Sequence, residues 1–291
     1  MKTIGIITDS HSGISQKDAE DLGILVLPMP FYCEEECFYE GVSIDRELFF
    51  EKLRGGQTVS TSQPSPAEVI DIWLKGLEKF DELLYIPLSS GLSGACGTAM
   101  MLAQEDVFED KVFVVDNGRI SVPLRRSILD AVELAKEELS ASEIKDILEK
   151  SKNDMSIYLG VETLEYLKKG GRITPATAAI GSALNIKPIL RVDTGKLDTY
   201  KKCRGMKKVK KELLDAMKHD LATTFKEQYE AGEITLMAAS SADEETAMAW
   251  VEEIKKNFPG MDVMYDHLSM GISCHTGEGA LGIGCSCKPR K

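Results

Sequence analysis

Apolar residues along this chain fall into short continuous runs, separated by longer segments in which they recur at helical spacing. The short runs predict β-strands at residues 4–8, 24–29, 82–88, 111–116, 155–161, 186–192, 196–202, 234–239 and 263–268. The longer segments predict helices at residues 45–54, 94–104, 122–139, 143–152, 162–169, 206–230 and 244–258, with further helices opening at Ser15 and Ser65 and a small-residue helix at 175–184. Strands that alternate with helices in this way indicate an α/β protein.

Helix-start and helix-stop signals support several of these boundaries. Ser65 can cap a helix, Pro66 suits its first position, and Glu68 can bond back to the Ser65 N–H. Residues 140–143 carry the same pattern, with serine at the cap and glutamate three residues on. Glycines at positions 55 and 56 end the helix before them.

The length of 291 residues is about twice that of a usual single domain, so we expect two domains. Residues 193–196, Asp-Thr-Gly-Lys, form a turn signal that predicts a β-hairpin in the second half. We predict an N-terminal α/β domain at residues 1–155, with an open, mostly parallel sheet flanked by helices. A C-terminal domain at residues 156–291 is expected to contain a mixed α/β sheet, a GGRI loop at 170–173 and an HTG loop at 275–277.

Composition and charge exclude several classes of protein. Hydrophobic residues make up 43% and charged residues 28%, and the formal net charge is −12, which argues against a general nucleic-acid binder. The charge-free stretch at residues 83–104 is interrupted by proline and glycine, so we do not expect a membrane span. The first residues lack the apolar stretch of a signal peptide, which favours a cytoplasmic protein. The seven cysteines match no paired zinc pattern, so we expect reduced thiols and no metal.

Residues 88–94, Leu-Ser-Ser-Gly-Leu-Ser-Gly, lie between a predicted strand and a predicted helix. This segment is either a plain turn or an anion site, because a helix start presents unpaired backbone N–H groups. No lysine follows as in a phosphate-binding loop, so we expect no nucleotide cofactor. Ser93 is also conceivable as a nucleophile, although the GxSxG pattern is absent.

Three other segments carry candidate binding groups. Thr61 and Ser62 belong to a hydroxyl-rich loop in which Ser65 already has a capping role. Arg172 follows two glycines, so that a guanidinium suited to bidentate oxygen contacts is held by a tight backbone. His275 and Gly277 lie in a glycine-rich segment that lets the backbone approach a ligand closely.

Asp9-Ser10 follows the first predicted strand, and open α/β sheets bind ligands at that end of their strands; the alternative is a simple turn. We interpret His11, His219 and His267 as structural.

A set of short motifs follows one another along the chain in this order: Thr8-Asp9-Ser10, Thr61-Ser62-Gln63-Pro64-Ser65, Ser89-Ser90-Gly91-Leu92-Ser93-Gly94, Val114-Val115-Asp116, the segment from Glu162 to Ile173, Ile186-Lys187-Pro188-Ile189-Leu190, and the segment from His275 to Ala280. This set, which spans nearly the whole chain, resembles the DegV family, which includes the fatty-acid-binding subunits (FakB) of bacterial fatty acid kinase. One departure is Asn117, where many members have serine.

The resemblance implies a non-enzymatic, two-domain α/β protein that buries one long-chain fatty acid, such as palmitate, in a tunnel between its domains. By the same resemblance, Thr61 and Ser93 bind the carboxylate, while Arg172 and His275 lie beside the head group. Ser62, Gly94 and Gly277 belong to the same lipid-binding loops. The implied partner is a separate ATP-dependent kinase subunit, and transient membrane contact would allow lipid exchange. The small-residue stretch at 176–183 is a candidate tunnel lining.

The residues are also compatible with two other functions. A hydrolase or acyltransferase would use Ser93 as nucleophile and His275 as base, and it would need a third orienting group. A protein that binds a phosphate ligand is the other alternative.

Positive charge is concentrated in one segment. Residues 187–211 contain ten lysines and arginines against two aspartates, a net charge of +8. This segment is either a solvated hairpin and helix face or a docking surface for an anionic partner.

Overall fold

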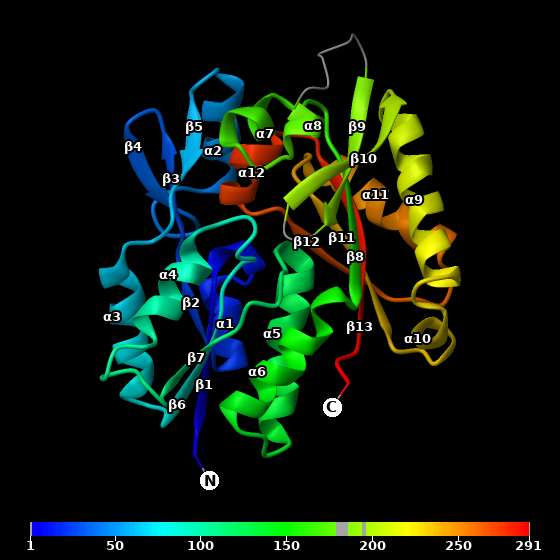
Figure 1. The fold of residues 1–291 in the computed structure, drawn as a ribbon. Coiled ribbons are helices and arrows are strands. Elements are labelled where there is room, and N and C mark those ends of the chain that lie inside the picture. The colour runs from blue at the N-terminus through cyan, green and yellow to red at the C-terminus, as the bar shows by residue number, and fades with distance from the viewer. Residues whose placement is uncertain (1, 179–185, 194–195, 291) are drawn as a thin grey trace. The chain divides into compact units, whose positions relative to one another are not determined.

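The computed structural model describes residues 2–178, 186–193 and 196–290 (Figure 1). The chain divides into two compact units. Unit 1 comprises Met1–Lys152 together with Pro289–Lys291, and unit 2 comprises Asn153–Lys288. Each unit has its own hydrophobic core.

Unit 1 is built on a parallel sheet in the order β2-β1-β6-β7, whose strands are β1 (Ile4–Asp9), β2 (Leu25–Leu27), β6 (Glu82–Ile86) and β7 (Val112–Val114). Helices cover both faces, as parallel sheets require. One face packs against α1, α5 and α6, and the other packs against α3 and α4 (Figure 1). Since the strands are buried on both sides, they read in the sequence as continuous apolar runs.

The helices of unit 1 begin largely where the sequence predicts. Their bounds are α1 (Gln16–Leu22), α2 (Arg46–Arg54), α3 (Pro66–Leu77), α4 (Ala95–Leu102), α5 (Ser121–Lys136) and α6 (Ala141–Lys150), with short 3-10 turns η1 (Ser10–Ser12) and η2 (Ser151–Asn153), the latter ending in unit 2. Complete capping boxes open α1 at Ser15, α3 at Ser65 and α6 at Ser140. These local signals satisfy helix N–H groups without help from the rest of the fold.

A small antiparallel sheet in unit 1 was not predicted. It has the order β4-β3-β5, formed by β3 (Pro30–Cys33), β4 (Glu36–Tyr39) and β5 (Val59–Thr61). The turn between β3 and β4 places Glu34 at φ 53°, a conformation that usually calls for glycine or asparagine. Helix α2 covers this sheet, with the Phe49 ring 5.4 Å from that of Phe31 in an edge-to-face contact.

Unit 2 is built on a mixed sheet in the order β10-β9-β8-β13-β11-β12. Its strands are β8 (Met155–Gly160), β9 (Ile186–Asp193), β10 (Lys196–Arg204), β11 (Ile234–Ser240), β12 (Val263–His267) and β13 (Leu281–Cys287). Strands β11 and β12 pair in parallel, and the other pairs are antiparallel. The predicted fold class, an α/β protein with a mostly parallel sheet followed by a mixed sheet, is confirmed.

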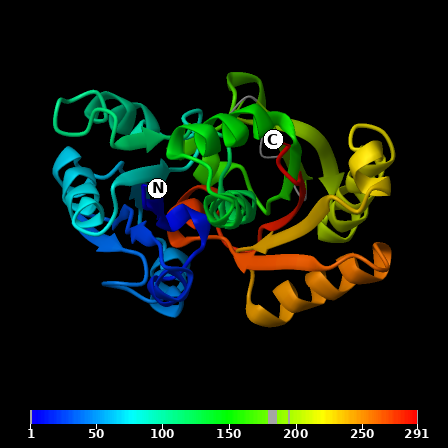
Figure 2. The same ribbon diagram turned by 90° about the horizontal axis from the view of Figure 1, so that it is seen from below.

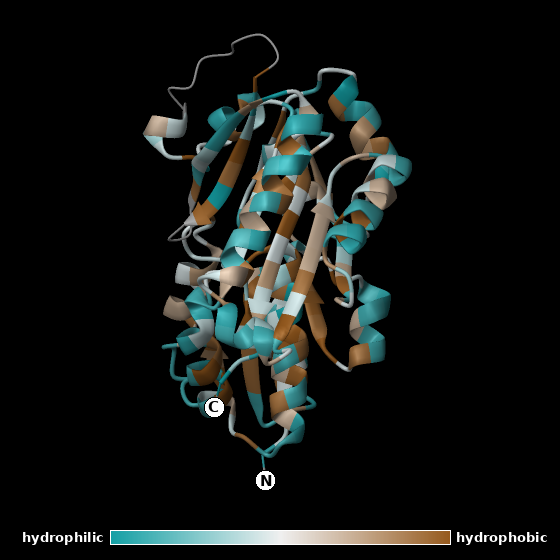
Figure 3. Cartoon of the chain, turned by 90° about the vertical axis from the view of Figure 1, so that its right-hand side faces the viewer, coloured by the Kyte–Doolittle hydropathy of each residue, from teal (hydrophilic) through white to brown (hydrophobic). Residues whose placement is uncertain are grey.

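The helices of unit 2 are α7 (Glu165–Gly170), α8 (Pro175–Ala178), α9 (Met206–Ala222), α10 (Lys226–Glu230), α11 (Glu244–Asn257) and α12 (Met270–Thr276). The core includes apolar residues of α9 and α11 packed on the sheet, and α11 runs beside β12 in Figure 2. Hydrophobic and hydrophilic residues are mixed along these helices, whereas most of the strands beside them show hydrophobic or intermediate residues (Figure 3). No helix in the described ranges is long and apolar enough to cross a membrane.

The single helix predicted at residues 206–230 is wrong. The chain leaves the helix after Ala222 and starts again at Lys226. The Thr223 hydroxyl donates to the His219 carbonyl at 2.7 Å, and Phe225 turns inward and is 4% exposed. Burial of the phenyl ring overrides the helical spacing of the surrounding residues.

The loop predicted around His275 is also wrong. Residues 270–276 form α12, and the Cys285–Cys287 segment, which matched no motif, belongs to β13 in the interior of the sheet. A Cβ atom at Gly284 would lie 2.9 Å from the Ser156 carbonyl oxygen, so this glycine allows neighbouring backbones to approach closely. A glycine-containing strand that is buried on both faces lacks the alternation that identifies a strand in sequence.

Two predicted features fall partly outside the described residues. The small-residue helix at 175–184, with its possible tunnel lining at 176–183, is described only as far as α8. The two residues at the tip of the predicted hairpin, 194 and 195, are likewise outside the described ranges, although the strands on either side pair as expected.

Candidate functional site

The two hydroxyl-rich segments of unit 1 lie against each other. Gln63 donates its side-chain amide to the Thr98 hydroxyl of α4 at 3.3 Å. The Gln63 amide oxygen packs against Gly94, because a Cβ atom added to Gly94 would lie only 2.7 Å from that oxygen. The loop that carries Thr61 and Ser62 is therefore held beside the loop that carries Ser93 and Gly94.

Ser93 is presented as a hydrogen-bond donor. Its Oγ accepts the N–H of Ala95 at 3.2 Å, which leaves the hydroxyl proton for another acceptor. Helix α4 begins at Gly94 without a side-chain cap from that residue, and the Ser93 hydroxyl lies at this positive end of the helix dipole. A half-buried hydroxyl beside an uncapped helix start suits a carboxylate or phosphate oxygen.

Thr61 and Ser62 differ in their surroundings. Thr61 is half-buried at the end of β5, where it pairs with Phe31 of β3, so the small sheet fixes its position. Ser62 is exposed, and its hydroxyl donates to the Gln63 carbonyl at 3.1 Å. The sequence identified Thr61 as a candidate, but the sheet that holds it was not predicted.

Asp9 is fully buried and acts within the protein. One of its carboxylate oxygens accepts the His11 N–H at 3.0 Å, and the other accepts the Leu88 N–H at 2.8 Å. The adjacent Ser10 hydroxyl accepts the Met29 N–H at 3.0 Å. The turn interpretation therefore accounts for Asp9 and Ser10, which tie the chain segments after β1, β2 and β6 together.

In unit 2 the glycine-containing end of α7 packs against the histidine-containing end of α12. A Cβ atom at Gly170 would lie 2.0 Å from His275 Nδ1, and one at Gly277 would lie 2.7 Å from the Tyr166 ring. These glycines are needed because side chains from the opposite helix occupy the space. The sequence placed the two segments 100 residues apart, and the fold brings them into contact.

Arg172 belongs to the same cluster as His275. Its guanidinium donates to the Gly170 carbonyl, the residue against which the His275 ring rests. Both side chains are half-buried. Helix α7 ends at Gly171 in the left-handed conformation, φ 67°, as its glycine predicts. The predicted residues thus form two clusters: Thr61, Ser62, Ser93 and Gly94 in unit 1, and Arg172, His275 and Gly277 in unit 2.

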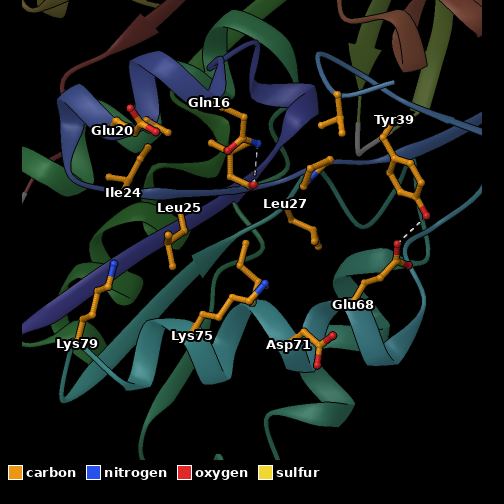
Figure 4. Close-up of a pocket in the computed structure, with 15 residues that line it drawn as sticks. Gln16, Glu20, Ile24, Leu25, Leu27, Tyr39, Glu68, Asp71, Lys75 and Lys79 are labelled. Carbon is orange, nitrogen blue, oxygen red and sulfur yellow. Dashed lines mark hydrogen bonds between the residues drawn. The ribbon is translucent and has the colours of Figure 1, made fainter. Parts of the chain in front are cut away.

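A cavity of about 650 Å³ opens on unit 1 beside β2, one of the two edge strands of the parallel sheet (Figure 4). Residues of α1 and α3 form its walls. At one end the Tyr39 hydroxyl donates to Glu68 at 2.8 Å, and this hydrogen bond to a carboxylate raises the pKa of Tyr39 to about 12. The predicted site residues do not line this cavity.

Five of the ten lysines and arginines in the basic segment at residues 187–211 form ion pairs with carboxylates in the described part of the chain. Lys187 pairs with Glu162, Lys201 and Lys208 with Glu212, Lys210 with Glu253, and Lys211 with Asp215. Lys202 and Arg204 are exposed on β10, which is an edge strand of the unit 2 sheet, and neither is in an ion pair within the described residues. The solvated-face interpretation fits the paired half of this segment, and the docking interpretation rests on exposed cations such as Lys202 and Arg204.

The fold and its loops define an α/β protein of DegV type, and the family model DegV, described as "Uncharacterised protein, DegV family", matches residues 3–288. A DegV domain-containing protein of Deinococcus radiodurans is 31% identical over 283 residues, covering 97% of each chain. The chain belongs to the DegV family.

Solved structures agree with this assignment. A DegV family protein from Thermus thermophilus, described as binding fatty acid, is 31% identical, with a TM-score of 0.85 and coverage of 98% of this chain and 99% of that one. DegV of Bacillus subtilis, described as a fatty acid binding protein, is 28% identical, with a TM-score of 0.85 and coverage of 99% and 100%.

Proposed function

We propose that this chain is a cytoplasmic carrier that binds one long-chain fatty acid and presents its carboxylate to a separate ATP-dependent acyl kinase, as a FakB-type subunit would. The observation that carries the proposal is the Ser93 hydroxyl, whose oxygen already accepts the Ala95 N–H and whose proton is left to donate. The fatty acid binding described for the Thermus and Bacillus relatives supports this choice of ligand.

The acyl chain and the head group contribute differently to binding. Burial of each methylene contributes roughly 0.8 kcal/mol, so a chain of about sixteen carbons supplies most of the affinity. The head group instead determines orientation, because a buried carboxylate needs hydrogen-bond donors. We assign that role to Thr61 and Ser93 in unit 1, with Ser62 and Gly94 in the same loops, and to Arg172, His275 and Gly277 in unit 2.

Ligand extraction tests the carrier function. Denaturing extraction of the purified protein, followed by mass spectrometry, should release a long-chain fatty acid, and the emptied protein should bind added palmitate. Thr61→Ala combined with Ser93→Ala should weaken palmitate binding about tenfold or more, since two donors to a charged group are lost. Ser60→Ala, an exposed hydroxyl on the same strand, is the matched control. Absence of acyl chain together with no palmitate binding would refute the proposal.

The kinase partnership needs its own test. The loaded chain, mixed with an acyl kinase subunit and ATP, should yield an acyl phosphate that hydroxylamine traps. Lys202→Glu with Arg204→Glu should reduce the rate about tenfold at low salt if β10 faces the partner, because exposed charges steer association. Lys211→Glu, a lysine already paired with Asp215, serves as a control. Unchanged phosphorylation in the double variant would exclude this docking surface.

The contacts of Ser93 within the described part of unit 1 supply no base for the hydrolase alternative, whose proposed base, His275, belongs to unit 2. Within the described residues of unit 1, no imidazole or carboxylate hydrogen-bonds to Ser93 Oγ, which instead accepts a backbone N–H. A serine nucleophile needs a base within hydrogen-bond reach. A fluorophosphonate probe should therefore leave Ser93 unlabelled, and covalent labelling at Ser93 would reopen the hydrolase interpretation.

A further inference from the structure

The loop that carries Ser93 is anchored at three consecutive residues. It follows β6, which lies between β1 and β7 in the parallel sheet. The Leu88 N–H donates to the Asp9 carboxylate at 2.8 Å, and the Ser89 N–H donates to the Arg119 carbonyl at 2.8 Å. The Ser90 N–H donates to Asp116 at 3.2 Å. Neighbouring strands thus hold the loop from both sides.

Asp116 makes the most extensive of these contacts. Its second carboxylate oxygen accepts the Ser90 hydroxyl at 2.6 Å, so the side chain binds both donors of one residue. Asp116 is itself fixed by Lys152 at 3.0 Å and by its own N–H, which donates to Glu149 at 3.0 Å. Burial raises the pKa of Asp116, but the hydrogen bonds from Ser90 and Lys152 outweigh burial, and the net shift is downward. The carboxylate therefore stays ionised and keeps both acceptors.

The anchored residues lead directly to Ser93. The Ser89 carbonyl accepts the N–H of Leu92 at 3.0 Å and the N–H of Ser93 at 3.2 Å. A shift of Ser89 or Ser90 would therefore move Ser93 and its hydrogen bond with Ala95. Because a hydrogen bond weakens steeply with misalignment, a donor presented to a carboxylate depends on this kind of support.

We propose that Asp116 is a positioning residue for head-group recognition: through Ser90 it sets where the Ser93 hydroxyl points, and it thereby makes the site selective for a carboxylate over an uncharged ester. This inference rests on the proposed fatty acid binding, and it assigns a role in that binding to Asp116, which lies in the loop after β7. Asp116 does not touch the ligand; it acts through the loop.

The test compares palmitate with methyl palmitate, which has the same acyl chain without the charge. Asp116→Ala should weaken palmitate binding about tenfold while methyl palmitate binding changes less than about threefold. Asp116→Asn should restore most of the selectivity, since its amide can still accept from the Ser90 N–H and its NH₂ can donate to the Ser90 hydroxyl. Asp106→Ala, which removes an exposed carboxylate elsewhere in unit 1, is the matched control and should stay within about threefold of wild type for both ligands.

If Asp116→Ala does not fold, Ser90→Ala removes the 2.6 Å hydrogen bond alone and should give a smaller loss in the same direction. A wild-type protein that binds palmitate, with both Asp116→Ala and Ser90→Ala retaining wild-type selectivity, would overturn the positioning role and leave the carrier function intact. A wild-type protein that binds neither ligand would instead reject the proposed function, and the positioning role with it.

Discussion

Gly170 shows how one missing side chain can shape a site. The His275 ring occupies the space that a Cβ atom at this position would need, with Nδ1 only 2.0 Å away. Gly170→Ala must therefore push the ring or part the two helices, and overpacking of this kind typically costs about 1–3 kcal/mol. We expect urea unfolding of unit 2 to show that loss.

The coupling between these two residues can be measured directly. His275→Ala removes the ring, so Gly170→Ala should cost much less in that background than in wild type. A cost that is the same in both backgrounds would mean that the strain lies elsewhere in the backbone.

Glu212 makes the contact between α9 and strand β10 of unit 2 depend on pH. Hydrogen bonds from Lys201 and Lys208 lower its pKa to about 2. Because the folded-state pKa lies below the ordinary value of 4.5, the stabilisation is complete above about pH 4.5 and is lost as the pH falls toward 2.

Glu212→Gln should accordingly lower the free energy of unfolding at pH 7 by about 1 kcal/mol or less, since both lysines are about half exposed and the pair is screened. Denaturant titrations of both proteins at pH 7 and pH 3 check this. A wild-type advantage that grows on acidification would contradict the assignment.

At the level of elements, the small sheet β4-β3-β5 depends on α2. Phe49 is fully buried and contacts both Phe31 and Phe50 edge to face. Phe49→Ala should cost about 3–5 kcal/mol, because the ring leaves a cavity that the sheet cannot close. Leu48→Ala, at a neighbouring position that is 42% exposed, should change stability by less than about 0.5 kcal/mol. Similar losses in the two variants would show that α2 does not act through Phe49.

Helix boundaries could be predicted well where the signal is local. The capping boxes at Ser15, Ser65 and Ser140 are complete within four residues, so no distant contact is needed to form them. Features that depend on distant contacts were missed. Strand β13 is defined by its partners β8 and β11, and the break after α9 is defined by burial of Phe225 in the core.

The candidate site was predictable to a similar extent. A hydroxyl-rich loop indicated Thr61, a glycine-containing turn between a strand and a helix indicated Ser93, and neighbouring glycines indicated Arg172 and His275. The contacts of Gln63 with α4 and of Asp116 with Ser90 join residues 26 or more positions apart, and no pattern in the sequence announces them. The residue types indicate which chemistry a site can perform, but the contacts that hold those residues in place depend on the fold.

Considered as a whole, the molecule contains two cores that can be followed separately. Its two tryptophans are divided between them, Trp73 in unit 1 and Trp250 in unit 2, and both are fully buried. Trp73→Phe leaves fluorescence that reports on unit 2, and Trp250→Phe leaves fluorescence that reports on unit 1. Because each unit has its own core, we expect two different urea midpoints.

The substitution is expected to weaken the unit that carries it, while the reporter lies in the other unit. The urea midpoint reported by Trp250 in Trp73→Phe should therefore equal the midpoint of one of the two unfolding phases of the wild-type protein. A single midpoint shared by both variants and by circular dichroism would show that the two units unfold as one.

The place of β13 in the sheet has a consequence for how the protein is made. This strand lies between β8 and β11, yet it follows every other strand of the sheet in chain order. On the ribosome, residues 1–152 are complete early and can fold while synthesis continues. Forty residues separate β11 from β13, and 120 separate β8 from β13, so both strands keep an unpaired edge until β13 has been synthesised. We therefore expect the protein to depend most on chaperones while its second half is being synthesised.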